Sequence, residues 1–288
     1  MGSEMCIRDS YRAVIAGAVG CQPKELHFTS CGTESDNWAI QAALWQNRHV
    51  GKHIITTQIE HHAILHTLKK LEKEGFDVQL LDVGPTGTVT AQQVADAIRE
   101  DTCLVTIMYA NNEIGSILPI SEIGAVCREA GVLFHTDAVQ AAGHLPIDVQ
   151  TQHIDMLSLS GHKFHGPKGV GVLYARRGIP LVNVIYGGAQ ERGKRAGTEN
   201  VPAIVGMAAA LREAMENLDR NAAYVTELRR TLEDKLSRIP ESRINGDRAL
   251  RLPGTLNMCF AGIEGESLLL LLDQAGIAAS SCSACTSA

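Results

Sequence analysis

Short apolar runs alternate with amphipathic stretches between Lys52 and Arg176, and this alternation constrains the fold more than any other feature of the sequence. Runs rich in aliphatic and β-branched residues predict buried strands, and the stretches between them have the spacing of helices with one apolar face. Strands that alternate with helices form mostly parallel sheets covered by helices. Strands are expected at residues 53–57, 78–81, 104–108, 132–134, 156–159 and 170–173, and helices at 91–99 and 121–130, with Ser121 as a helix cap. The sequence therefore predicts an α/β protein.

The sequence changes in character after Val201. Residues 204–238 are rich in Ala, Leu, Glu and Arg with helical periodicity, which predicts one long helix or two. A short β stretch at 255–260 and a helix near 265–273 follow. We expect a large domain over residues 11–205 and part of a smaller α+β domain over 206–288. Residues 1–10 show no periodicity and are interpreted as a non-native leader.

Composition narrows the class of protein. Of 288 residues, 45% are hydrophobic and 20% charged, which is ordinary for a soluble enzyme. The net charge of -6, without a block of Lys or Arg, predicts no nucleic-acid partner. The longest aliphatic run, Leu268 to Leu272, is too short to span a bilayer, so no membrane association is expected. The eight cysteines are scattered and no apolar signal segment opens the chain, which favours a reducing cytoplasm.

Polar residues follow three of the expected strands. Asn112 comes after the strand at 104–108, Asp137 after that at 132–134, and Lys163 after that at 156–159. Active sites in parallel sheets lie beyond the carboxyl ends of the strands. The three side chains are therefore expected to converge on one edge of the sheet.

Two of these residues suggest a cofactor. Lysines are most often solvated surface charges. Lys163, however, follows a buried strand within Ser-Gly-His-Lys-Phe-His-Gly-Pro-Lys-Gly, where partial desolvation lets an amine form a Schiff base with a carbonyl group. Asp137 fits either a turn or helix cap, or a carboxylate that pairs with the pyridine nitrogen of pyridoxal phosphate. An Asp and a Lys at the ends of consecutive strands suit that cofactor.

Two further segments have both a structural and a functional interpretation. Gly32 and Thr33 precede a helical stretch that runs from Trp38; they fit a plain helix cap, or a helix N-terminus that binds phosphate. His61 follows the strand at 53–57, where a histidine is usually structural, but its imidazole can also stack on a flat ring and relay protons.

The last residues, 280–288, are almost all small, which predicts a mobile loop. Cys282 and Cys285 form a C-x-x-C pair there, and since no matching second pair is seen, no metal site is expected. A thiol on a mobile loop suits a nucleophile that enters and leaves a buried site.

Together these segments resemble a known family. The similarity runs from about Pro23 to Ser287, and its distinctive stretches are residues 107–115, 135–140, 158–169, 187–200 and 279–287. They closely resemble the pyridoxal-phosphate-dependent cysteine desulfurases of the NifS/IscS type. The resemblance implies the fold type I of such transferases, with a mostly parallel seven-stranded sheet between helices and a smaller C-terminal domain that is incomplete here.

The resemblance also implies a role for each matching residue. Lys163 would be the Schiff-base lysine, Asp137 the partner of the pyridine nitrogen, and Cys285 the nucleophile. His61 would stack on the ring, and Gln140 would contact its phenolic oxygen. Asn112 would lie beside the substrate carboxylate and the cofactor. The phosphate would be held by Gly32, Thr33, Ser160 and His162, and Thr198 would reach the phosphate of a partner subunit's cofactor.

The implied reaction converts L-cysteine to L-alanine and leaves a persulfide on Cys285. A homodimer and a sulfur-acceptor protein, such as an iron–sulfur scaffold, are the partners that the resemblance implies. Cys282 stands where the family usually has glycine, which fits either a tolerated small residue or a thiol that forms a disulfide or accepts sulfur. Cys31 likewise replaces a small residue, beside the phosphate loop. Relative to the family, an N-terminal segment and a C-terminal part with a substrate-binding arginine are expected to be missing from this sequence. The alternatives are a selenocysteine lyase, a small-molecule aminotransferase, a non-catalytic partner protein, or an inactive truncated fragment.

Overall fold

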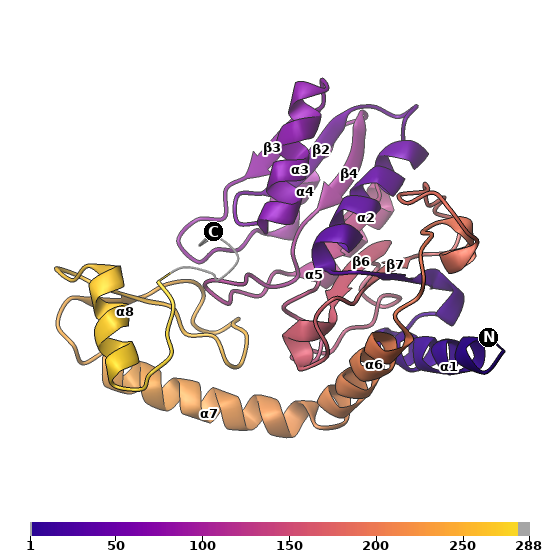
Figure 1. Ribbon diagram of the computed structural model, residues 1–288. Coiled ribbons are helices and arrows are strands. Elements are labelled where there is room, and N and C mark those ends of the chain that lie inside the picture. Colours follow the sequence, from indigo (N-terminus) through magenta and orange to yellow (C-terminus); the bar gives the residue numbers. More distant parts are fainter. Residues whose placement is uncertain (1, 282–288) are drawn as a thin grey trace.

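A seven-stranded sheet forms the centre of the protein (Figure 1). The structure is a computed structural model, and it describes residues 2–281. Along the sheet the strands lie in the order β1-β7-β6-β5-β4-β2-β3. Their bounds are Leu26–Thr29 (β1), His53–Thr57 (β2), Asp77–Leu81 (β3), Thr102–Thr106 (β4), Phe134–Asp137 (β5), Met156–Ser160 (β6) and Gly171–Ala175 (β7).

The five strands from β6 to β3 run parallel to one another, and β7 is antiparallel to both of its neighbours, β6 and β1. The carboxyl ends of β4, β5 and β6 therefore lie side by side at one edge. The fold class predicted from the alternation of strands and helices is confirmed.

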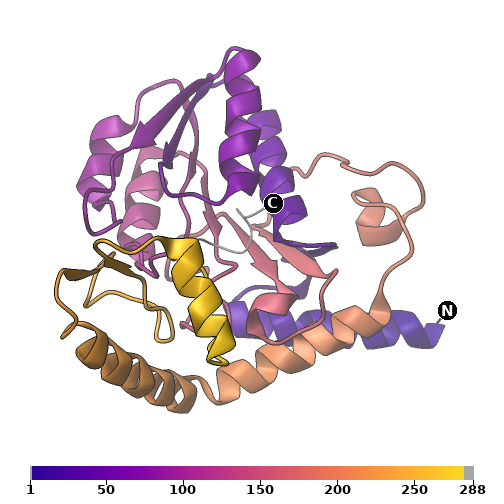
Figure 2. The same ribbon diagram turned by 60° about the vertical axis from the view of Figure 1, so that its left-hand side comes forward.

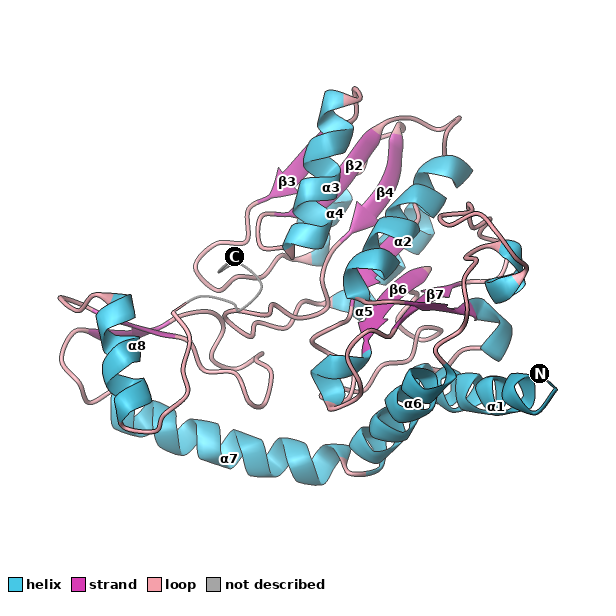
Figure 3. Cartoon of the chain, viewed as in Figure 1, coloured by secondary structure: helices cyan, strands magenta, loops and turns pink. Residues whose placement is uncertain are grey.

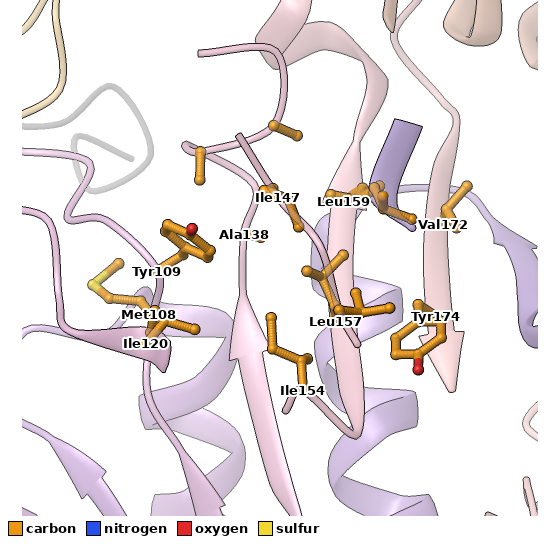
Figure 4. Close-up of a cluster of buried hydrophobic side chains, with 14 of the residues drawn as sticks. Met108, Tyr109, Ile120, Ala138, Ile147, Ile154, Leu157, Leu159, Val172 and Tyr174 are labelled. Atoms are coloured by element: carbon orange, nitrogen blue, oxygen red, sulfur yellow. The ribbon is translucent and has the colours of Figure 1, made fainter. Parts of the chain in front are cut away.

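Helices cover both faces of the sheet (Figure 3). On one face, α2 (Gly32–Gln46) and α3 (His62–Lys73) enclose a core that contains Trp38, Ile54 and Leu104. On the other face, α1 (Gly2–Val19), α4 (Ala91–Ala97), α5 (Ile120–Ala130) and α6 (Val201–Glu216) share a larger core with Ile55 and Val105. Neighbouring residues of one strand enter opposite cores, as the pleat requires. Figure 4 shows part of the larger core, where Leu157 and Tyr174 lie close together.

The C-terminal part continues along two helices rather than one. Helix α6 gives way at Asn217 to α7 (Leu218–Leu236), which extends away from the sheet and leads to the two-stranded sheet of β8 (Ser242–Ile244) and β9 (Met258–Phe260) and to α8 (Gly265–Gln274) (Figure 2). No helix within the described residues combines the length and apolar character needed to cross a bilayer.

Two local predictions differ from the structure. The prediction that Ser121 caps a helix is wrong, because α5 begins at Ile120 with Pro119 at the N-cap position and Ser121 inside the first turn. The strand predicted at 132–134 lies later, over Phe134–Asp137, because Gly131 ends α5 in a left-handed conformation and the chain must first turn toward the sheet. Helix α1 begins at Gly2, so most of the predicted leader is helical, and Arg8 there forms an ion pair of 2.6 Å with Glu199.

Candidate active site

A cavity of about 410 Å³ opens at the edge where the parallel strands end. Its walls come from the loops that follow β1, β2, β4, β5 and β6, and from the C-terminal part of the chain. It contains nine of the predicted site residues. The lining consists of Cys31, Gly32, Thr33, Asp36, His61, Met108, Asn112, Glu113, Asp137, Val139, Gln140, Ser160, His162, Lys163, Leu256, Asn257 and Ser280.

The N-terminus of α2 forms one wall of the cavity. Cys31 occupies the N-cap position and makes no side-chain capping hydrogen bond, so the first backbone N–H groups of the helix are not satisfied by a cap. A Cβ atom on Gly32 would lie 2.7 Å from Val139 Cγ2, which leaves room only for glycine. Uncapped N–H groups at a helix N-terminus bind anions such as phosphate.

Asp137 lies at the carboxyl end of β5 and is buried. Its Oδ1 accepts a hydrogen bond of 2.9 Å from the backbone N–H of Val139, which orients the carboxyl group. Burial raises its pKa to about 6, while the Val139 N–H and the positive charge of Lys163 act in the opposite direction. A cationic group placed in the cavity would favour the ionised form further.

Lys163 lies in a short 3-10 helix, Gly161–Phe164, directly after β6. The turn is compact, because Gly166 N–H bonds to Gly161 O at 2.9 Å and His144 Nε2 bonds to Lys163 O at 3.0 Å. Within the same turn, a hydrogen bond of 2.9 Å joins Ser160 Oγ to His162 Nδ1. The backbone of Lys163 is thus fixed, while its side chain extends into the cavity wall.

His61 is the N-cap of α3. Its Nδ1 accepts a hydrogen bond of 3.1 Å from Ala63 N–H, which places the ring proton of the neutral form on Nε2. Burial lowers its pKa, and the positive charges of His62, Lys163 and His66 lower it further. The imidazole is therefore a neutral ring with a fixed orientation at the cavity wall.

Asn112 is held by a turn that its neighbour organises. Asn111 Oδ1 accepts from the N–H groups of Glu113 and Ile114, both at 2.9 Å, and Asn111 Nδ2 donates to Ile59 O at 2.9 Å. This turn links the ends of β4 and β2. Gln140 lies three residues after Asp137 and also lines the cavity.

Two buried acids near the cavity were missed in the sequence. Asp36 lines the cavity one helical turn after Gly32, a spacing that places both on one face of α2. Glu60 precedes His61; its Oε1 accepts hydrogen bonds from Thr57 Oγ1 at 2.6 Å and Met108 N–H at 3.0 Å. Burial raises the pKa of Glu60 to about 8. The i,i+4 spacing to Gly32 was the one available signal for Asp36.

Among the described residues, one predicted site residue does not line this cavity. Thr198 lines a separate, smaller cavity of about 140 Å³ together with Ser30, Gly169 and Arg195. Cys282 and Cys285 lie outside the described residues.

Comparison with known proteins gives the family. The family model for Aminotransferase class-V matches residues 5–288. The chain belongs to this family. Within it, the chain is 52% identical over 280 residues to the cysteine desulfurase IscS of Clostridium botulinum, and 52% identical over 276 residues to that of Methanosarcina thermophila. Each alignment covers 96% of this chain, and 70% and 68% of the respective relative. The resemblance to cysteine desulfurases of the IscS/NifS type is thereby confirmed.

Solved structures of family members have the same fold. A NifS-like protein superposes with a TM-score of 0.92 at 40% identity, covering 96% of this chain and 76% of the other. SspA, solved in complex with cysteine, superposes with a TM-score of 0.85 at 38% identity, covering 98% of this chain and 79% of the other. Cysteine desulfurases of this family depend on pyridoxal phosphate.

The residues present fit that cofactor. An uncapped helix N-terminus suits the phosphate, the buried Asp137 suits a protonated pyridine nitrogen, and Lys163 supplies an amine to the same cavity. Ser160 lies beside Gly32, since a Cβ on Gly32 would be 3.5 Å from Ser160 Cβ, and His162 is linked to Ser160 by the hydrogen bond described above.

Proposed function

We propose that the chain is a cysteine desulfurase that uses this cavity to bind pyridoxal phosphate and L-cysteine, and that delivers the sulfur to Cys285. The observation that carries the proposal is the convergence of Lys163, Asp137 and the uncapped N-terminus of α2 on one cavity, in a chain about half identical to IscS proteins. These groups suit the aldehyde, ring nitrogen and phosphate of a single cofactor molecule.

Each residue has a defined task in this proposal. Gly32, Thr33, Ser160 and His162 bind the phosphate, and Gln140 contacts the phenolic oxygen. Asp137 would keep the ring nitrogen protonated, and His61, a neutral imidazole at the cavity wall, would stack on the ring. When bound, the cofactor withdraws electrons from the substrate α-carbon, which weakens the bond between the β-carbon and sulfur.

The reaction balances without any further oxidant or reductant. Lys163 Nζ would hold the cofactor by its aldehyde, and the same amine would be the base that moves the α-proton of the substrate. Asn112 orients the substrate carboxylate. The Cys285 thiolate attacks the substrate sulfur, the C–S bond breaks with its electron pair going to carbon, and that carbon takes up a proton. The products are alanine and a Cys285 persulfide.

The persulfide is proposed to pass to a sulfur-acceptor protein, such as an iron–sulfur scaffold, in the cytoplasm. A homodimer is proposed as well, because Thr198 lies away from the cavity of its own chain and is available to a partner subunit's cofactor. A dimeric mass in solution for the cofactor-loaded protein would support this arrangement, and a monomeric mass at full cofactor occupancy would contradict it.

The experiment that tests the function compares Cys285→Ala with Cys282→Ala. The two substitutions remove the same thiol group three residues apart, so the second is a matched control. With cofactor and L-cysteine supplied, Cys285→Ala is expected to lose sulfide and alanine formation while retaining the absorbance of bound cofactor, and Cys282→Ala is expected to keep both. Undiminished desulfuration by Cys285→Ala would favour a selenocysteine lyase or an aminotransferase instead.

A further inference from the structure

Asp36 is a buried acid that lines the cavity, and among the described residues no Lys or Arg forms an ion pair with it. It is 1% exposed, and its Oδ1 makes no hydrogen bond in the described part of the chain. Its position on α2, one turn after the proposed phosphate site at Gly32, places it against β5 and β6. An ionised carboxylate in this position would have an unsolvated oxygen, which is costly in a protein interior.

The groups that face Asp36 increase this cost. The titratable neighbours are His135 and Asp137 from β5, Glu60 from the loop before α3, and Cys31 from the loop before α2. Three of these are acids, and none is a permanent cation. Burial, and then the charge of Asp137, raise the pKa of Asp36 well above its ordinary value, and a hydrogen bond from Ser158 opposes this shift without cancelling it.

His135 is the one neighbour that could pair with an ionised Asp36. It is fully buried, and its Nε2 lies 3.7 Å from Asp36 Oδ1. Burial lowers the pKa of His135 to about 3, so the ring is neutral. Thr106 Oγ1 bonds to its Nδ1 at 2.9 Å and Ser158 Oγ to its Nε2 at 3.0 Å. Charging both partners in such an interior costs more than their attraction returns.

We propose that Asp36 is a positioning residue that stays a neutral acid beside His135, so that Asp137 alone carries negative charge at the ring nitrogen. The packing of Asp36 against β5 and β6 holds the start of α2 on the sheet, and therefore fixes the phosphate site relative to Asp137. The inference rests on the proposed function in its use of Asp137, but its main test does not depend on turnover.

The test is infrared difference spectroscopy of the whole chain at pH 7.5, wild type minus Asp36→Asn. This pH is chosen because Asp137, with a pKa of about 6, is ionised there while Asp36 is expected to keep its proton. The expected difference is the loss of a carbonyl stretch of a protonated carboxylic acid. The loss of carboxylate bands alone would show that Asp36 is ionised, and would overturn the proposal. Glu60→Gln serves as the matched control that assigns the band of the other buried acid.

A second measurement covers the case in which Asp36→Asn does not fold. Wild-type protein with ¹³C-labelled aspartate carboxyl groups should retain, at pH 7.5, one carboxyl carbon with the chemical shift of a protonated acid. If all aspartates have carboxylate shifts, the proposal is wrong.

Cofactor titration tests the positioning role. Asn preserves a neutral group of the same shape, so Asp36→Asn should bind pyridoxal phosphate within about threefold of wild type, whereas Asp36→Leu, which leaves His135 without this partner, should bind about tenfold more weakly. Equal weakening in both variants would show that the negative charge is needed, and would contradict the neutral acid. A neutral Asp36 in a protein that does not desulfurate cysteine would leave this inference intact and remove only the proposed function.

Discussion

Replacing Gly32 by alanine tests whether the proposed phosphate site at the N-terminus of α2 and the carboxylate of Asp137 depend on each other in position. The new Cβ would lie 2.7 Å from Val139 Cγ2, and ordinary contact begins at 3.4 Å, so the two groups must separate by about 0.7 Å. Val139 has a branched, stiff side chain, and its own N–H holds Asp137 Oδ1 at 2.9 Å. A shift at Gly32 is therefore transmitted to the carboxylate.

The expected cost follows from the size of this overlap. Adding a methyl group to a tightly packed site costs about 1–3 kcal/mol, which corresponds to roughly 5- to 150-fold in a binding constant. We expect Gly32→Ala to weaken pyridoxal phosphate binding by a factor in this range. Equilibrium titration of the apoprotein, followed by cofactor absorbance, measures it.

Gly17 provides the control. It lies in α1, and a Cβ there would meet nothing within 4 Å. Gly17→Ala should leave cofactor binding unchanged and stabilise the fold by about 0.5–1 kcal/mol, since alanine restricts the unfolded chain and favours the helix. Wild-type affinity in Gly32→Ala would refute the coupling of the helix N-terminus to Asp137.

Three further predictions concern charge. Burial raises the pKa of Glu60 from 4.5 to about 8, so between these pH values the folded apoprotein keeps the Glu60 proton and the unfolded chain loses it. The free energy of unfolding should therefore fall by up to about 1.4 kcal/mol per pH unit as the pH rises through this window. Denaturant titrations at pH 6 and 9 should show this loss in wild type and a smaller one in Glu60→Gln; equal losses would contradict the assignment. Glu191→Gln breaks a buried ion pair with Arg12 (2.6 Å) and should lower unfolding free energy by about 3 kcal/mol, whereas an unchanged melting temperature would show that the pair is dispensable. Asp137→Asn should reduce turnover about 100-fold or more with folding intact, and a rate near that of wild type would exclude its role at the ring nitrogen.

The convergence of Lys163, Asp137 and Asn112 could be predicted from the sequence because each follows a strand that is readable as an apolar run. Once β4, β5 and β6 are parallel neighbours, residues just past their carboxyl ends must share one edge. The positions of Lys163, Asp137 and Asn112 at this edge follow from the order and direction of the strands, without side-chain detail.

Asp36 and Glu60 could not be found in the same way. An aspartate near the start of a helix is typical of a solvated position, and only the packing of α2 on the sheet buries this one. Glu60 likewise follows a strand but turns inward to Thr57 and Met108. Their burial depends on tertiary contacts between elements far apart in the sequence.

The central claim is that Lys163 binds the cofactor in this cavity. Borohydride reduction of the protein loaded with pyridoxal phosphate fixes the cofactor covalently to the lysine it occupies, and peptide mass mapping then identifies that lysine. The expected result is that Lys163 alone carries the added mass of the reduced cofactor. Modification of Lys168 instead, or no modified lysine at saturating cofactor, would contradict it.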